Sequence, residues 1–206
     1  MTSSSSRGVT ASIPLPPALL GVKGLLTFNE QSEAEFEELK VSDPIAAQDA
    51  YNTSLALEAA VRDSEAGQGS RAVAEVLYNS EPGDFVPLIV HRAFLECCRN
   101  ADPDVMYRLL ITGGLVIRGV SALGECVREV CAAAHAFSQS PCSVEQCRFG
   151  QGMRCLQHLY TSGADFNVWS PSDGLTPLSY AIRVGNPPLV YKVIFTDGLR
   201  TLSFSW

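Results

Sequence analysis

The chain has 206 residues, of which 46% are hydrophobic and 18% charged, and its formal net charge is −7. This length and composition predict one compact globular domain and exclude a chain dominated by a long solvated tract. No segment has the dense basic patch that duplex DNA or an anionic membrane requires, and no apolar run is long enough to span a bilayer. We therefore expect a protein that binds neither nucleic acid nor membranes.

The seven cysteines are an odd number, which does not indicate a disulfide framework in a chain of this length. Several fall where predicted helices would bury small apolar groups, and free cysteine packs as a small hydrophobe in such places. A reducing compartment is the simpler interpretation, so we expect the protein in the cytoplasm or the nucleus.

Residues 1–40 are expected to form a flexible N-terminal tail, because they open with a serine run and continue with a proline-rich stretch. This serine-rich, acid-free start is also compatible with an organelle transit peptide. Residues 30–40 are acidic and have the pattern of a short helix. Asp43 followed by Pro44 predicts a helix start, since Asp is a favoured cap and Pro suits the first turn. The folded domain is expected to cover 41–206.

The pattern of this domain predicts short helices in pairs, separated by segments that contain Gly or Pro. In chain order the expected pairs are 53–62 with 70–78, 87–99 with 104–112, 121–137 with 152–161, and 177–184 with 188–195. An inserted loop, 138–152, separates the two helices of the third pair. Such helices are too short to bury their apolar faces alone, so the pairs should stack into an all-α solenoid.

An internal repeat supports this prediction. Residues 102–114 match 186–198 position by position, with Pro, Tyr and Thr identical at three places and a shared glycine at the end. Residues 153–164 match 187–198 in the order of their apolar positions. The second shift is close to the repeat length of about 33 residues that is typical of one solenoid family.

Two segments carry a specific resemblance. The sequence of 173–181, DGLTPLSYA, resembles the opening of an ankyrin repeat, and that of 162–167, SGADFN, resembles its end. Gly185 and Asn186 resemble the turn between the two ankyrin helices. The chain is therefore similar to the ankyrin-repeat family. This resemblance implies an ankyrin-type helical solenoid of about four repeats with short hairpin fingers, which binds another protein, is not an enzyme and needs no cofactor.

The motif residues have physical roles that can be tested in a structure. Thr176 should cap the first helix of its repeat, and Gly163 should take the left-handed conformation that ends a second helix. Asp165 should bond to backbone groups of the turn that follows. Ser179 stands where ankyrin repeats usually place histidine, so the usual histidine-to-threonine hydrogen bond should be lost and local stability lowered.

The resemblance implies that a partner binds on the concave face and at the finger tips. Trp169 falls at a predicted tip, where an exposed tryptophan would anchor a partner. The alternative is that this ring folds back over the loop 138–152. The expected partner-binding residues are Trp169, Ser170, Asp173, Leu175, Tyr180 and Arg183.

A structural zinc site is an alternative function for such a solenoid. Cys131 and His135 are four residues apart on a predicted helix, and Cys142 and Cys147 follow in the loop. The chain has no tight Cys-x-x-Cys pair, so we predict that it binds no metal. None of the three histidines lies in a recognised nucleophile motif. A further alternative is a regulatory segment of a larger multidomain protein.

The last residues are strongly apolar. The fourth repeat is expected to end near Gly198, and 199–206 contain Arg200 as their only charge. A solenoid exposes the apolar flank of its last repeat unless a polar unit covers it. We predict an uncapped end that leads to self-association, the alternative being that the tail folds back as its own cap.

Overall fold

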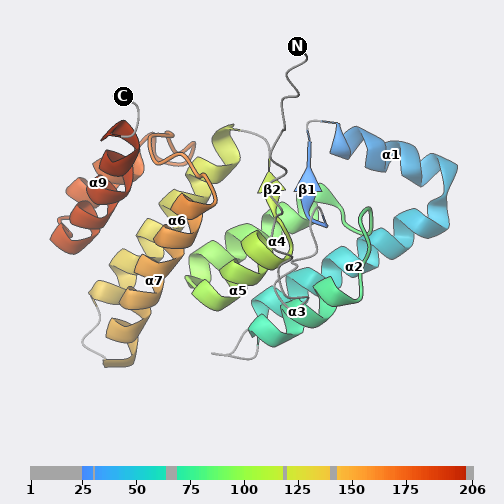
Figure 1. Ribbon diagram of the computed structural model, residues 1–206, viewed down its shortest axis with the longest axis horizontal. Coiled ribbons are helices and arrows are strands. Elements are labelled where there is room, and N and C mark those ends of the chain that lie inside the picture. The colour runs from blue at the N-terminus through green and yellow to red at the C-terminus, as the bar shows by residue number, and fades with distance from the viewer. Residues whose placement is uncertain (1–24, 30, 64–68, 118–119, 140–142, 203–206) are drawn as a thin grey trace, which may run out of the picture.

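The computed structural model describes residues 25–29, 31–63, 69–117, 120–139 and 143–202. This part of the chain contains nine α-helices, one π-helical turn and two very short strands, which confirms the predicted all-α class (Figure 1). In chain order the elements are β1 (Thr27–Phe28), α1 (Ser32–Ser42), α2 (Pro44–Arg62), α3 (Gly69–Tyr78), α4 (Pro87–Asn100), α5 (Pro103–Tyr107), η2 (Arg108–Thr112), β2 (Val116–Ile117), α6 (Val120–Ser138), α7 (Ser143–Thr161), α8 (Pro177–Arg183) and α9 (Pro187–Leu202).

Helix α2 begins where the sequence predicts a helix start. Pro44 is its first residue, and the Asp43 carboxylate accepts a hydrogen bond from the Ala46 backbone N–H at 3.0 Å. The helix runs from there without interruption, so the first helix of the first pair is longer than the predicted 53–62.

Ser54, in the middle of α2, is fully buried. Its hydroxyl donates to the Ala50 carbonyl oxygen at 2.8 Å and accepts from the Val86 backbone N–H at 2.7 Å. Val86 directly precedes α4, so this one side chain satisfies a buried backbone group and joins α2 to the start of the next pair.

Part of the predicted flexible tail, 1–40, is folded; residues 1–24 lie outside the described part of the chain. Leu25 and Leu26 are 2% and 0% exposed. Leu26 donates to the Gly113 carbonyl oxygen and accepts from the Val116 N–H, which leads into the parallel pairing of β1 with β2. The tail prediction is therefore wrong for 25–29. It followed from the serine-rich and proline-rich composition of the preceding residues, whereas Leu25 and Leu26 pack in the core.

The predicted inserted loop, 138–152, is also mostly helical. Helix α7 begins at Ser143 and pairs closely with α6. Gly150 and Gly152 suggest a helix break from sequence alone, but packing against a neighbouring helix outweighs a glycine cost of about 1 kcal/mol each.

The helices pack in two rows. Helices α2, α4, α6 and α8 contact one another in that order, and α3, α5 with η2, α7 and α9 do the same (Figure 1). Each first-row helix also contacts the second-row helix that follows it in the chain. The described part thus contains four consecutive pairs of contacting helices.

One apolar core runs through all four pairs. Every helix of the two rows contributes at least one fully buried side chain to it, among them Leu57, Leu77, Phe94, Leu109, Val130, Leu156, Ala181 and Leu189. The core also holds the free thiols of Cys97, Cys98, Cys126, Cys131 and Cys155. This confirms that these cysteines pack as small apolar groups; burial raises the pKa of the Cys131 thiol to about 12.

A polar contact crosses each junction between consecutive pairs, in both rows. These contacts are Arg92–Glu58, Arg99–Glu129 and Arg128–Asp173 in the first row, and Arg108–Ser70, Arg154–Asp104 and Lys192–Gln157 in the second. They lie outside the apolar core, so they fix the alignment of neighbouring pairs while burial provides most of the stability.

Helices α6 and α7 are in close contact at Gly152. A Cβ atom placed there would lie 2.8 Å from the Ala134 Cβ and 3.3 Å from the Ala134 Cα, whereas one placed at Gly150 would meet nothing within 4 Å. The same helix therefore contains one glycine that the packing needs and one that it does not.

This difference predicts opposite effects of the same substitution. Gly152→Ala should lower the free energy of unfolding by about 1–3 kcal/mol, because the added methyl group forces α6 and α7 apart. Gly150→Ala should raise it by up to about 1 kcal/mol through helix propensity. Urea denaturation of both variants measures the effects, and a neutral or stabilising Gly152→Ala would contradict the close packing of this pair.

Candidate partner-binding surfaces

The segment that joins α7 to α8 contains the predicted finger. Gly163 has a φ of +89°, and the Asp165 carboxylate accepts a hydrogen bond from the Asn167 backbone N–H at 2.9 Å. Ala164 and Phe166 are buried and anchor this stretch in the core. The left-handed glycine and the aspartate-supported turn predicted from the sequence are both confirmed.

A tight turn over 170–175 follows. The Ser170 N–H donates to the Leu175 carbonyl oxygen at 3.0 Å, and the Gly174 N–H donates to the Ser170 carbonyl oxygen at 2.9 Å. Gly174 has a φ of +65°, a conformation that glycine adopts without steric cost. The turn is closed by these hydrogen bonds, which limits its freedom to move.

Thr176 caps α8, as predicted. Its hydroxyl oxygen accepts from the Ser179 backbone N–H at 3.2 Å, and Pro177 occupies the first turn. The same hydroxyl donates to the Ser179 hydroxyl at 3.0 Å. Serine at the position of the usual histidine thus still gives the threonine a hydrogen-bond partner, although a different one.

Trp169 immediately precedes the closed turn and is 68% exposed. Most of its ring surface therefore faces solvent, which is the arrangement that partner binding requires and that folding back over 138–152 does not give. Its role in binding stays a prediction.

The other predicted binding residues divide into two groups. Ser170 and Tyr180 are 2% and 7% exposed, so direct contact of these side chains with a partner is excluded in this structure. Asp173 and Leu175 are half-buried, and Arg183 is exposed. The sequence did not distinguish the side chains that pack inside the protein from those that face the solvent.

Asp173 and Tyr180 belong to a cluster around Arg128, a residue of α6 that no sequence motif indicated. The Arg128 guanidinium lies 3.4 Å from the centre of the Tyr180 ring, a cation–π contact. It donates to one Asp173 carboxylate oxygen at 2.7 and 3.0 Å, and Arg183 reaches the same oxygen at 3.5 Å. The cluster ties the turn before α8 to the preceding pair.

The Asp173 carboxyl is ionised at neutral pH. Burial acts to raise its pKa, but hydrogen bonds from Arg128 and the Leu175 N–H, together with the arginine charges, outweigh burial and hold the pKa below its ordinary value. A carboxyl whose pKa is lowered by folding stabilises the fold above its unfolded pKa. That contribution is lost as the pH falls through the folded pKa.

Two of the four candidate zinc ligands, Cys142 and Cys147, have side chains outside the described part of the chain. Cys131 lies in the core, and His135 packs edge-on against Tyr180 with ring centres 6.4 Å apart. Among the described side chains, no group of three or more His, Cys, Asp or Glu residues is arranged to hold a metal ion.

The last helix pair has an exposed apolar flank. Ile182, Tyr191, Ile194 and Phe195 are each 46–63% exposed, and a shallow hollow of about 440 Å³ lies among several of these residues. The side chains of the predicted tail, 199–206, lie outside the described part. Self-association through this flank stays a prediction.

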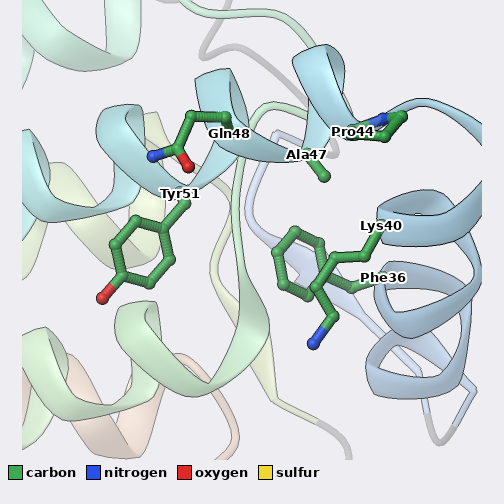
Figure 2. A pocket seen from close by; sticks show the side chains of 6 residues that line it. All are labelled: Phe36, Lys40, Pro44, Ala47, Gln48 and Tyr51. Carbon is green, nitrogen blue, oxygen red and sulfur yellow. The ribbon is translucent and has the colours of Figure 1, made fainter.

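A second hollow surface lies between α1 and α2, at the N-terminal end of the two helix rows. Figure 2 shows Phe36 and Lys40 of α1 facing Ala47, Gln48 and Tyr51 of α2 across it. Phe36 lies within the predicted flexible tail, and no local sequence pattern places its ring beside Tyr51. The acidic helical pattern of 30–40 was the only signal of this surface.

Comparison with known proteins returned no match to this chain among family models, curated proteins or solved structures. Within the described part, no helix combines the length and the apolar character needed to cross a membrane.

The Arg128 cluster leads to a stability prediction. Arg128 is 12% exposed and Asp173 17%, so Arg128→Gln should lower the free energy of unfolding by about 1–3 kcal/mol. Arg99 also bridges two pairs, through Glu129, but is 49% exposed, and Arg99→Gln should cost less than about 1 kcal/mol. Chemical denaturation at neutral pH compares the two, and equal losses would show that Arg128 is an ordinary surface residue.

Proposed function

We propose that the protein is an ankyrin-type repeat solenoid that binds another protein through its first-row helices and through the loop between α7 and α8. Four features support this proposal: the two-row packing of helix pairs, the left-handed Gly163, the Thr176 cap and the DGLTPLSYA sequence. Stacked pairs of this kind present an extended surface to partners, and specificity comes from the side chains on it.

The exposure of Trp169 is the observation on which the binding proposal rests. A tryptophan that is 68% exposed on a folded protein leaves a large apolar area in water, and burying such a ring against a partner is strongly favourable. Tryptophan is enriched among the residues that dominate binding energy at protein interfaces.

The loop that carries Trp169 is already ordered before a partner arrives. Its turn is closed by the Ser170–Leu175 and Gly174–Ser170 hydrogen bonds, and Asp173 fastens it to Arg128 of α6. Binding to an ordered loop loses less conformational entropy than binding to a mobile one, so more of the interaction energy appears as affinity. Arg183, exposed at the end of α8 and 3.5 Å from the Asp173 carboxylate, adds a charged group next to this loop.

The partner can be captured at the proposed site itself. A photo-crosslinking amino acid placed at position 169 of the full chain should form a defined adduct, which mass spectrometry identifies. Placed at Tyr78, which is 84% exposed at the end of α3 in the second row, the same group should not form it.

With that partner purified, Trp169→Ala should weaken binding by about 2 kcal/mol or more, which is roughly 30-fold in Kd. The free energy of unfolding should change by less than about 1 kcal/mol, since the ring is mostly exposed. Tyr78→Ala is the matched control, and its Kd should stay within about twofold of wild type. An unchanged Kd for Trp169→Ala, or loss of the fold without a separate binding defect, would overturn the proposal.

A further inference from the structure

A groove at the N-terminal end of the stack lies between α1 on one side and α2 and α4 on the other. It consists of two hollows of about 420 and 450 Å³ that share Phe36 and Tyr51 as lining residues. The second hollow continues to Pro87 and Leu88 at the start of α4. Figure 2 shows Phe36 directed from α1 towards the α2 side of the first hollow.

Helix α1 is incompletely covered. None of its eleven residues is buried, and its main apolar attachment is Phe36, which packs against Ala50, Val86 and Ile89. A helix of this length is marginal in water without a packed face. Tyr51 and Leu88, on the opposite wall, are 44% and 63% exposed. The groove therefore presents apolar surface from three helices that the described part of the chain leaves open.

The helix on one side of this groove, α1, is acidic. Helix α1 contains four glutamates and one lysine, and Glu33 and Glu37 line the groove. Two cations also line the groove, and both are paired within the protein: Lys40 with Glu37, one of the two lining glutamates, and Arg92 with Glu58 through hydrogen bonds of 2.5 and 2.6 Å. The lining itself is balanced, but α1 as a whole has three more acids than bases, so an incoming segment meets an apolar floor beside a helix of net negative charge.

We propose that this groove binds a short cationic amphipathic helix of a partner protein. Its apolar side chains enter between Phe36 and Tyr51, and its Lys or Arg side chains face Glu33 and Glu37. Helix-in-groove recognition has this form, with apolar anchors one turn apart and charges on the flanks. The site goes beyond the function proposed above, because it lies at the opposite end of the stack from Trp169.

The charge of α1 disfavours a second copy of this chain as the occupant. A symmetric contact would place one acidic α1 against another, and the chain as a whole has a net charge of −7. Opposite charge both speeds encounter and selects partners, so a basic segment is the complementary occupant.

The test uses two fluorescein-labelled synthetic peptides of about 15 residues with the same leucine positions on one helical face. One carries Lys at the remaining positions and the other Glu. Fluorescence anisotropy with the full chain near physiological salt should show the Lys peptide binding at least about 10-fold more tightly than the Glu peptide.

Two charge-reversed variants distinguish the groove from the rest of α1. Glu33→Lys with Glu37→Lys reverses two charges on the side of α1 that lines the groove. Glu35→Lys with Glu38→Lys makes the same change in charge at residues that line neither of the two hollows. The first pair should weaken the Lys peptide by about 10-fold or more, and the second by less than about threefold. Trp169→Ala should leave this binding unchanged, so a failure here is distinguishable from a failure of the proposed function.

Four results would overturn the proposal. The first is that the Lys peptide does not bind at concentrations up to about 1 mM. The second is that the two double variants lose equal affinity for the Lys peptide, and the third is that the Lys peptide binds only after Arg7→Glu with Lys23→Glu. The fourth is that light scattering shows a dimer that Phe36→Ala converts to a monomer. The second would show general attraction to negative charge. The third would identify residues before Leu25 as the occupant, and the fourth a second copy of the chain.

Discussion

The structure depends on the burial of helix faces between consecutive pairs. Helix α8 has seven residues and α5 five, so neither makes a stable unit by itself. Fully buried side chains such as Phe94, Leu156 and Leu189 belong to one core that continues from pair to pair. Burial of apolar side chains between consecutive pairs therefore provides most of the stability of these short helices.

The polar contacts at the junctions have a different role. Exposed pairs such as Arg154–Asp104 add little stability and mainly select one alignment of neighbouring helices. The Arg128–Asp173 pair is more buried, and the Arg128 guanidinium also makes a cation–π contact with the Tyr180 ring. At this junction the same side chains align α6 with α8 and hold the loop before α8 in place. The loop that bears Trp169 is therefore held in place by packing that lies behind it.

Local chemistry explains what the sequence could predict. The Asp43-Pro44 start, the Thr176 cap and the left-handed Gly163 each depend on residues close in the chain, and their roles follow from short-range geometry. The helix pairs follow from apolar periodicity in the same way.

Features that depend on distant residues were not predictable. The local sequence predicts that Leu26 belongs to a tail, but its backbone donates a hydrogen bond to Gly113. The local sequence also predicts a loop over 143–152, but this segment is helical where it packs against α6. Ser170 and Tyr180 were expected to contact a partner, yet tertiary contacts bury both side chains. The groove beside α1 combines Phe36 with Tyr51 and Leu88, and no local pattern connects these three residues.

Amide hydrogen exchange of the full chain carrying Leu189→Ala tests whether each helix pair is stabilised mainly by its direct neighbours. The substitution empties a fully buried position in α9 and should cost about 2–5 kcal/mol. If stability passes between neighbouring pairs, protection should fall most in α8 and α9, less in α6 and α7, and remain unchanged in α2 and α3. An equal loss of protection in all helices would contradict the account and show a single cooperative core without stacked units.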